Sequence, residues 1–507
     1  MRKITPEIIF VKEDPWRIET EVLYLPVFEN KFTEDVEKLD HLLDGELNRL
    51  RKLGDLKGRV GEIIRIYPRI PEIKVKRIIT IGLGPYEKFS EETLRIYGGY
   101  IGSDAKNSGY ESISIITPHS DKILSDRSLY LVLEGFNLSI YTFSLKTGDE
   151  IRGIKKIILK EPAFDTKPVL ERVEVLSEAI YIARDIANTP ASDMNPEKLE
   201  NYVRDLFKEF PDVEIFVIRG RELVERGMNG IYSVGKGSSV EPRLIILRYK
   251  GAQNESPIAL VGKTVTFDAG GLDLKTPQGM RDMKFDKSGG AAVIGVMYAV
   301  AKSRLPVNLV VLIPAVENLP SGSSYKPGDV LRMYGGLTVE IDNTDAEGRV
   351  IMADAISYAK KDLGAKIIID IATLTGAIVV ALGNHAAGLF TNSERLAEIF
   401  TKASERSGDR LWRMPLWEEY FEDIKSEVAD IKNTGVAGAA GAQAGAAFLA
   451  KFAEDVEWAH LDIAGVAWVQ QEGPKKPYYP KGATGYGVRL LYEFLEILRS
   501  SKLVFLG

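Results

Sequence analysis

The stretch VGKTVTFDAGGLDLK, residues 261–275, begins inside the apolar run IALVG at 258–262. An apolar run of this length is typical of a buried strand, so we predict a strand that ends where the polar stretch begins. Lys263 and Asp268 then lie just beyond the strand, and two glycines follow them. Because glycine lets the backbone approach a ligand closely, the stretch predicts part of a ligand site.

Similar runs on both sides of this stretch determine the predicted fold. Strands are expected at 244–249, 258–262, 308–314, 337–342, 366–372 and 460–464. Helices are expected at 289–303, 350–363, 395–407 and 486–500. Strands that alternate with helices predict an α/β domain with a mostly parallel central sheet, whose ligands bind beyond the carboxyl ends of the strands.

The first third of the chain repeats this alternation on a smaller scale. Strands are expected at 22–28, 78–84 and 112–118, and helices at 36–53 and 91–108. We therefore predict a smaller N-terminal α/β domain at 1–165, a linker helix at 166–187 and a larger domain at 188–507. The tetrapeptide GLGP at 82–85 follows an expected strand, and it is more typical of an ordinary turn than of an anion site.

Composition excludes several classes of site. The 507 residues include no cysteine, so a disulfide, a thiol nucleophile or a cysteine-bound metal is ruled out. With only four histidines, a metal site has to depend mainly on Asp and Glu. The net charge of −6 gives no electrostatic reason to expect a nucleic acid or an anionic membrane as partner.

Two further stretches bear on location. The first residues contain no apolar run long enough for a signal peptide, so we expect a cytoplasmic protein. Residues 371–392 are long enough to span a membrane, but three glycines, Asn384 and His385 interrupt them. We therefore predict a buried strand and loops there, and no membrane span.

Acidic residues gather after two further predicted strands or turns. Asp286 precedes the helix expected from residue 289, and NTDAEGR at 343–349 places Asp345, Glu347 and Arg349 on one turn. Residues two apart in an extended loop point to the same side, so Asp345 and Glu347 can face one point. Converging carboxylates repel each other unless cations neutralise them, and two divalent ions with oxygen ligands do so. A single one of these acids would more simply cap a helix or face water.

Several motifs resemble the leucyl aminopeptidase family, which are dinuclear-metal cytosol aminopeptidases. NTDAEGR matches the family signature, and VGKTVTFDAGG is similar to its metal-binding segment. The resemblance continues through IANTPASDMNP, ATLTGA (372–377), DIKNTG (430–435), HLDIAG (460–465) and GATGYGVRLL (482–491). It covers most of residues 180–495, so it implies that the larger domain is a catalytic peptidase domain and that the smaller one serves assembly or regulation.

The resemblance implies a ligand set for two metal ions, with Mn²⁺, Zn²⁺ or Co²⁺ as candidates. Asp268 and Glu347 would bridge both ions. Lys263 and Asp286 would complete the tight site, and Asp345 would complete the exchangeable site. Lys263 would have to coordinate as a neutral amine, which requires a strongly lowered pKa.

The resemblance also implies the remaining roles. Lys275 and Arg349 would be the catalytic pair, with Lys275 stabilising the oxyanion and Arg349 holding a bicarbonate ion that carries the proton. Water between the metals would supply the hydroxide that attacks peptides with a free N-terminus. The family forms homohexamers, and the pocket for the first side chain would be lined by Met283, Thr373, Leu374 and Gly376.

Three departures from the family pattern and three alternatives remain. Ala269 replaces a usual Ser or Thr, Thr264 replaces a common Gly, and residues 437–447 are small and flexible. The alternatives are a dinuclear phosphoesterase, a DNA-binding regulatory protein and a catalytically silent relative. The family pattern argues against a phosphoesterase, and the net charge argues against a DNA-binding protein. The intact set of ligands argues against a silent relative. The physiological metal and the preferred first residue stay open.

Overall fold

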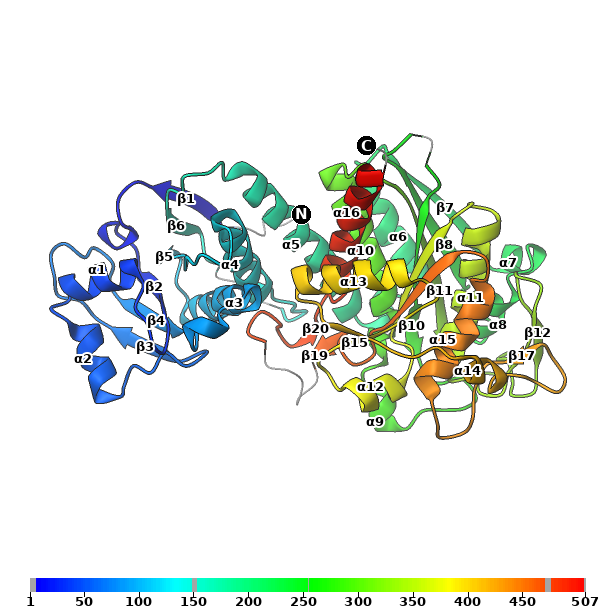
Figure 1. Ribbon diagram of the computed structural model, residues 1–507. Helices are drawn as coiled ribbons and strands as arrows, with labels where there is room; N and C mark the ends of the chain where they lie inside the picture. Colours follow the sequence, from blue (N-terminus) through cyan, green and yellow to red (C-terminus); the bar gives the residue numbers. More distant parts are fainter. Residues whose placement is uncertain (1–5, 148–152, 254, 470–475, 506–507) are drawn as a thin grey trace. The chain divides into compact units, whose positions relative to one another are not determined.

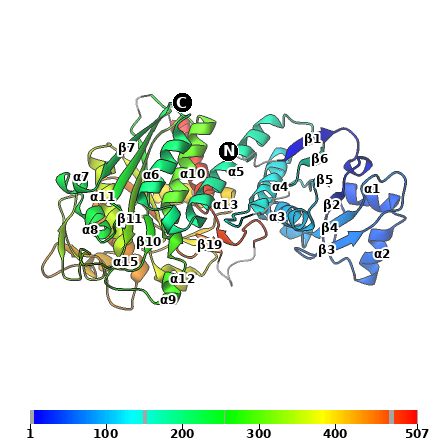
Figure 2. The same ribbon diagram turned by 180° about the vertical axis from the view of Figure 1, so that it is seen from behind.

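The computed structural model describes residues 6–147, 153–253, 255–469 and 476–505, and Figures 1 and 2 show it from opposite sides. The chain divides into two compact units. Unit 1 comprises Met1–Ser177 and Lys475–Pro480, and unit 2 comprises Glu178–Pro474 and Lys481–Gly507. The division falls inside the long helix α5 (Lys167–Asn188). Each unit has its own sheet, as expected of two α/β domains.

Unit 1 contains a six-stranded sheet in its described part, with the order β1-β6-β5-β2-β4-β3. All neighbours pair in parallel except β3 and β4, which are antiparallel. The strands are β1 (Glu7–Val11), β2 (Val22–Val27), β3 (Ile63–Ile66), β4 (Ile78–Gly82), β5 (Ser112–Ile115) and β6 (Lys156–Lys160). The helices are η1 (Pro15–Arg17), α1 (Glu34–Leu42), α2 (Glu46–Leu53), η2 (Tyr86–Lys88), α3 (Glu91–Ser108) and α4 (Ser125–Ile140).

The helix expected at 36–53 is two helices, and the reason is local. Asp44 and Gly45 both have positive φ angles, of 51° and 75°, which end α1 and separate it from α2. The carboxylate of Asp40 accepts hydrogen bonds from the backbone N–H of Leu47 (2.7 Å) and Asn48 (3.3 Å) at the start of α2. A side chain of the first helix therefore caps the second.

The GLGP tetrapeptide forms a turn whose backbone donors are already used. The N–H groups of Gly82, Leu83 and Gly84 donate to the carbonyl oxygens of Glu62, Val27 and Gly58 at 2.8–2.9 Å. Proline has no N–H group. The tetrapeptide thus has no backbone donor left for an anion, which agrees with the interpretation as an ordinary turn.

Unit 2 contains a nine-stranded sheet in its described part, with the order β16-β15-β18-β14-β9-β11-β8-β7 and with β10 also paired to β11. The sheet is mixed but mostly parallel. The pairs β7–β8, β8–β11 and β15–β18 are antiparallel, and the other pairs are parallel. Its strands are β7 (Val213–Arg219), β8 (Arg243–Lys250), β9 (Ile258–Gly262), β10 (Thr264–Asp268), β11 (Asn308–Asn318), β14 (Ile367–Ala372), β15 (Ala387–Thr391), β16 (Leu411–Arg413) and β18 (Glu457–Asp462).

Helices cover both faces of this sheet, with α10 and α11 on opposite sides (Figure 1). The helices of unit 2 are η3 (Ala191–Asp193), α6 (Pro196–Phe207), α7 (Arg221–Glu225), α8 (Asn229–Gly235), α9 (Pro277–Met280), η4 (Met283–Lys287), α10 (Ser288–Ser303), α11 (Glu347–Lys361), α12 (Gly376–Leu382), α13 (Glu394–Ser407), α14 (Glu418–Glu422), α15 (Gly441–Phe452) and α16 (Val488–Phe505). None of the helices in the described part of the chain has the length and apolar character needed to cross a membrane.

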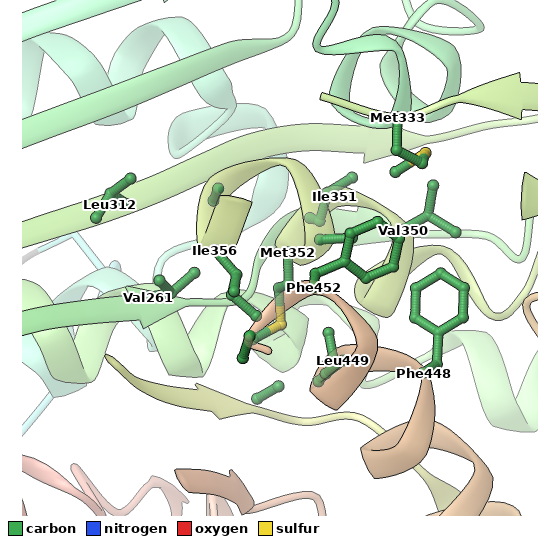
Figure 3. Packing of buried hydrophobic residues seen from close by; sticks show 14 of the residues in the cluster. Val261, Leu312, Met333, Val350, Ile351, Met352, Ile356, Phe448, Leu449 and Phe452 are labelled. Carbon is green, nitrogen blue, oxygen red and sulfur yellow. The ribbon is translucent and has the colours of Figure 1, made fainter. Parts of the chain in front are cut away.

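The core of unit 2 fixes α11 against the sheet. Figure 3 shows side chains of α11, including Val350 and Met352, in one cluster with Val261 and Leu312 of the sheet and Phe448 of α15. Burial of this many apolar side chains favours the folded arrangement by the hydrophobic effect. The first turn of α11, which carries acidic and basic residues, is therefore held in place by the packing of the turns that follow.

Three predictions about unit 2 need correction. Residues 264–268 form the strand β10, where a loop was expected. Residues 371–392 include the helix α12 between β14 and β15. The expected strand at 337–342 is the short β13 (Thr338–Glu340), which pairs with β12 (Val330–Arg332) and β17 (Ile431–Lys432) outside the central sheet.

The loop expected after β9 is a strand because β11 is longer than predicted. β11 pairs with β9 up to Leu312 and with β10 from Ala315 onward. Pro314 lies at this change of partner, where its missing N–H group costs no ladder hydrogen bond. The predicted strand ended at residue 314, four residues before the end of β11. A second small ladder, of β19 (Trp468–Val469) and β20 (Gly482–Ala483), completes the described strands.

Candidate active site

Lys263 lies in the interruption between β9 and β10. Its backbone N–H donates to Ile371 at 3.0 Å, and its carbonyl accepts from Gly290 at 2.8 Å, so the backbone is fixed on both sides. The buried side chain passes Gly348, where a Cβ atom would lie 2.8 Å from Lys263 Nζ and closer still to its carbon atoms. The absence of a side chain at Gly348 thus gives the lysine its path.

The Lys263 ammonium group contacts two carboxylates and one carbonyl. Its Nζ atom lies 2.9 Å from Asp286 Oδ1, 2.9 Å from Glu347 Oε1 and 2.8 Å from the carbonyl oxygen of Thr373. Burial alone would lower the pKa of Lys263, but the carboxylates of Asp286, Glu347 and Asp268 outweigh it and raise the pKa above its usual value. In this arrangement Lys263 is a protonated counter-charge for the acids.

Asp268 is the last residue of β10, and two donors orient its carboxylate. Oδ1 accepts hydrogen bonds from Asn318 Nδ2 and from the backbone N–H of Gly270, both at 2.9 Å. Oδ2 lies 2.9 Å from Lys275 Nζ. Asn318 ends the neighbouring strand β11, so the parallel pairing of β10 and β11 brings donor and acceptor together.

Asp286 lies on the short 3-10 helix η4. The hydroxyl of Thr373 donates to its Oδ1 at 2.7 Å. The helix is tied to the turn at residues 188–189, because Lys284 Nζ and Lys287 Nζ each donate at 3.0 Å to the carbonyl oxygens of Asn188 and Thr189. These contacts explain why the IANTP segment belongs with the site.

We expected one irregular turn to carry Asp345, Glu347 and Arg349, but the structure places these residues on two different elements. Glu347 and Arg349 lie in the first turn of α11, where residues two apart point in different directions. Glu347 faces Lys263, whereas Arg349 Nη1 donates to the carbonyl oxygen of Asn433 at 2.9 Å. Asp345 lies before the helix, and its carboxylate contacts Lys275 Nζ at 2.5 Å.

The three buried carboxylates converge on one point. Ligand atoms of Asp268, Asp286 and Glu347 lie within 4.8 Å of one another. Burial and the neighbouring acids raise the pKa of Glu347 to about 8, and burial raises the pKa of Asp286 to about 6. Asp286 Oδ2 and Glu347 Oε2 have no hydrogen-bond partner among the residues that the structure describes.

This donor set fits divalent cations. Buried polar atoms are normally hydrogen-bonded, so two unpartnered carboxylate oxygens in one cluster indicate that another group completes them. Oxygen ligands from Asp and Glu suit Mn²⁺, and a mixed nitrogen and oxygen set suits Zn²⁺ or Co²⁺. The carboxylates of Asp268, Asp286 and Glu347 are therefore close enough together to hold a metal ion.

Lys275 and Arg349 flank the cluster on different elements. Burial alone would lower the pKa of Lys275, but Asp268, Glu347 and Asp345 outweigh it and raise the pKa. Burial lowers the pKa of Arg349 to about 10, which still leaves it charged at neutral pH. Its Nε atom has no hydrogen-bond partner in the described part of the chain, so it can bind an anion.

Of the four residues expected to line the substrate pocket, Thr373 lies at the cluster and Leu374 lies near Arg349. Thr373 hydrogen-bonds to two residues of the site, Asp286 and Lys263. Leu374 adjoins Arg349, because a Cβ atom at Gly445 would lie 3.0 Å from Leu374 Cδ2 and 3.3 Å from Arg349 Nη2. The other two, Met283 and Gly376, are the first residues of η4 and α12, and their place in a substrate pocket stays a prediction.

The departures from the family pattern have local explanations. Ala269 is buried, and its backbone N–H donates to Asn318 at 2.9 Å, so the backbone is held without a side-chain hydroxyl. Thr264 fits because the facing residue is Gly290, where any Cβ atom would collide with the threonine hydroxyl. Residues 441–447 belong to the helix α15, so this part of the segment is not a flexible loop, and its small residues admit Arg349 and Leu374.

Sequence reasoning missed several residues that support the site. Thr344 hydrogen-bonds to the loop after β10, and Asn318 bonds both Asp268 and Thr344. Asp462 accepts hydrogen bonds from the backbone N–H of Leu374 (3.1 Å) and the hydroxyl of Thr375 (2.7 Å). Thr344 and Asp462 lie within the motifs NTDAEGR and HLDIAG, which assigned them no role, and the only signal of Asn318 was its position after an expected strand.

Known proteins share this fold and these segments. The model of the cytosol aminopeptidase family, catalytic domain, matches residues 181–492, and that of its N-terminal domain matches residues 25–146. A relative named probable cytosol aminopeptidase, from Geobacter sp., is 39% identical over 491 residues, which cover 96% of this chain and 98% of the relative.

Two solved structures are similar over nearly the whole chain. A mutant of tomato leucine aminopeptidase has a TM-score of 0.85 and 31% identity, and the match covers 97% of this chain and 96% of that one. The bottromycin maturation enzyme BotP in complex with Mn has a TM-score of 0.83 and 30% identity, and the match covers 94% of this chain and 99% of that one.

The family matches define the chain as a hydrolase, and its cluster of buried carboxylates is of a kind that suits metal ions. The matches are more specific, and the chain belongs to the cytosol aminopeptidase family. It is an aminopeptidase of the leucyl aminopeptidase type, whose substrates are peptides. The resemblance found in the sequence motifs is therefore confirmed.

Proposed function

We propose that this aminopeptidase needs two divalent cations, which Lys263, Asp268, Asp286, Asp345 and Glu347 would hold. The observation that carries the proposal is the convergence of three buried carboxylates within 4.8 Å, with oxygen atoms that lack a partner among the described residues. The manganese in the similar BotP structure gives independent support. Mn²⁺, Zn²⁺ and Co²⁺ are the candidates.

The five residues would bind the two ions in different combinations. Asp268 and Glu347 would serve both ions, Lys263 and Asp286 the more enclosed one, and Asp345 the more exposed one. The side chain of Asp345 is 33% exposed, whereas those of Asp286 and Glu347 are almost fully buried. When bound, such ions act as Lewis acids that polarise a carbonyl and lower the pKa of water.

Lys275 and Arg349 would carry out the remaining steps. The Lys275 ammonium group lies beside Asp268 and Asp345, so its charge can stabilise the oxyanion that forms when the peptide carbonyl is attacked. Arg349 keeps its proton near neutral pH and cannot act as a base. Its buried guanidinium group would instead hold a bicarbonate ion, which would supply a proton acceptor beside the cluster.

The substrates would be peptides with a free N-terminus and a leucine-like or broader range of first residues. Met283, Thr373, Leu374 and Gly376 would line the pocket for the first side chain. We also propose a homohexamer in the cytoplasm, supported by the family assignment. Residues 1–165 would serve assembly or regulation, 166–187 would link the domains, and 188–507 would form the catalytic domain.

A reconstitution experiment tests this function. The protein is stripped with a chelator, its metal content is measured, and Mn²⁺, Zn²⁺ or Co²⁺ is added back before assay on a panel of aminoacyl amides. We expect no hydrolysis without metal, two bound ions per chain at full activity, and a preference for leucine-like amides. Full activity of a preparation verified as metal-free would contradict the proposal.

A further inference from the structure

Thr344 joins the two segments that carry most of the acids. It is fully buried and precedes Asp345 in the chain. Its backbone N–H donates to Asp273 Oδ2 at 2.7 Å, and its hydroxyl donates to the carbonyl oxygen of Gly270 at 2.7 Å. The same hydroxyl accepts from the backbone N–H of Asp273 at 2.9 Å. Thr344 and Asp273 are thus linked in both directions.

The carbonyl group of Thr344 is held equally firmly. It accepts hydrogen bonds from Asn318 Nδ2 at 3.0 Å and from the Tyr325 hydroxyl at 2.7 Å. Asn318 uses its other amide hydrogen for Asp268. One residue therefore connects the end of β11, the loop after β10 and the segment before α11.

The turn opposite Thr344 is shaped for close approach. Gly270 and Gly271 have φ angles of 89° and 67°, which non-glycine residues adopt at a cost. A Cβ atom at Gly271 would lie 3.0 Å from the Thr344 hydroxyl oxygen and 2.8 Å from Asn318 Oδ1. The glycines of this turn thus make room for Thr344 and Asn318 as well as for a ligand.

These hydrogen bonds determine the spacing between Asp268, Lys275 and Asp345, although Thr344 and Asp273 are not themselves proposed metal ligands. Asp268 lies two residues before Gly270, Lys275 lies two residues after Asp273, and Asp345 follows Thr344. The position of Asp345 relative to Asp268 and Lys275 therefore depends on the bonds of Thr344. Asp286 and Lys263 are held independently, through Thr373.

We propose that Thr344 and Asp273 form a positioning clamp that sets the affinity of the more exposed of the two cation sites. The inference rests on the proposed two-cation function. Residues that orient metal ligands from outside the ligand set change metal affinity by about 10- to 100-fold when they are replaced. Loss of the clamp should therefore weaken the site that includes Asp345 and spare the site of Lys263 and Asp286.

The test is a stepwise titration of the metal-free full chain with Mn²⁺, followed by calorimetry and by counting bound ions after dialysis. Thr344→Val removes the hydroxyl at nearly constant volume, and Thr344→Ser retains it. Asp273→Ala removes the other half of the clamp at an exposed position, so this variant can be measured even if the valine variant folds poorly. Thr484→Val is the matched control, because it removes another buried threonine hydroxyl with carbonyl acceptors.

We expect Thr344→Val and Asp273→Ala to weaken the second Mn²⁺ by about 10-fold or more and the first by less than about 2-fold. Thr344→Ser and Thr484→Val should bind both ions as the unsubstituted chain does. The clamp is refuted if Asp273→Ala keeps both affinities, if both ions weaken equally, or if Thr484→Val has the same effect. A failure of the unsubstituted chain to bind two ions would instead refute the proposed function, and with it the clamp.

Discussion

The ammonium nitrogen of Lys263 lies 2.9 Å from a carboxylate oxygen of Glu347, and both side chains are almost completely buried. An isolated charge in such a place would cost several kcal/mol of desolvation, so each group depends on the other. A cation bound by these residues takes over the role of the positive charge, and a metal ligand has to be an unprotonated amine. With the proposed ligand set, binding of metal would therefore release a proton from Lys263.

This relationship predicts that metal affinity rises with pH. Without metal the pKa of Lys263 is raised by the acids, and the pKa of Glu347 is raised to about 8, so both groups hold protons at pH 6. Binding releases these protons, which makes it weaker as the pH falls. Titrations with Mn²⁺ at pH 6, 7 and 8 should show increasing affinity. A constant affinity over this range would contradict the shared site.

Substitutions should separate metal binding from catalysis. Asp268→Asn and Glu347→Gln remove carboxylates at the centre of the cluster, so both variants should lose metal and activity together while retaining their fold. Lys275→Ala should retain both ions and lose on the order of 10²–10³ in kcat, because it removes an oxyanion partner. Metal content and rates measured on the same preparations test this division. Loss of metal from the Lys275 variant would show that the roles are assigned wrongly.

Gly348→Ala should disturb the site although it adds one methyl group to a helix. The new Cβ atom would collide with the side chain of Lys263, which cannot move aside because it is fully enclosed. We expect weaker binding of the more enclosed ion, measured by the same Mn²⁺ titration. Gly322→Ala is the control, since a Cβ atom there meets nothing within 4 Å. Equal affinities in both variants would show that Lys263 does not bind metal.

The enzyme should require a free amino terminus on its substrate. The nitrogen of an acetylated amine shares its lone pair with the acyl carbonyl, which makes it a poor metal ligand, and the acyl group also displaces the scissile carbonyl. We expect leucine amide to be hydrolysed at least about 10²-fold faster than its N-acetyl counterpart at the same concentration. Comparable rates would rule out a requirement for the free amine and leave the metal site unaffected.

The chain should assemble into a hexamer. Two tryptophans of unit 2, Trp412 and Trp417, have exposed fractions of 67% and 62% in the single chain, which is costly for side chains of this size. Light scattering at working concentration should give about six times the chain mass of 56.2 kDa. A monomer under these conditions would contradict the proposed assembly.

Much of the fold could be predicted because strands and helices alternate clearly in the sequence. The sequence predicted α3 at 91–108 with both ends correct, since Ser90 caps it and Gly109 ends it in a left-handed conformation. It predicted one helix in place of α1 and α2, and thereby overlooked Asp44-Gly45, a dipeptide typical of turns, whose positive φ angles separate the two helices. It missed β10, which pairs with the part of β11 that extends beyond the predicted strand.

The candidate site could be predicted as a set of residues but not as a geometry. Motifs identified the acids and lysines that the structure brings together around Lys263. They contain Thr344 and Asp462 but gave no role to either residue, because the contacts of both cross about 70 to 90 positions of the chain. Such long-range hydrogen bonds depend on how the strands are ordered, and no local pattern records that order.

The division of the chain has a consequence for synthesis on the ribosome. The short stretch that contains Lys476 and Tyr478 belongs to unit 1, and both residues contact Glu92, at 3.1 and 2.6 Å. Nearly four hundred residues separate the two partners in the sequence. Domains generally fold as they emerge, the N-terminal one first. Unit 1 stays incomplete until almost the entire catalytic unit has been translated. A nascent chain that stalls late therefore carries two incomplete units.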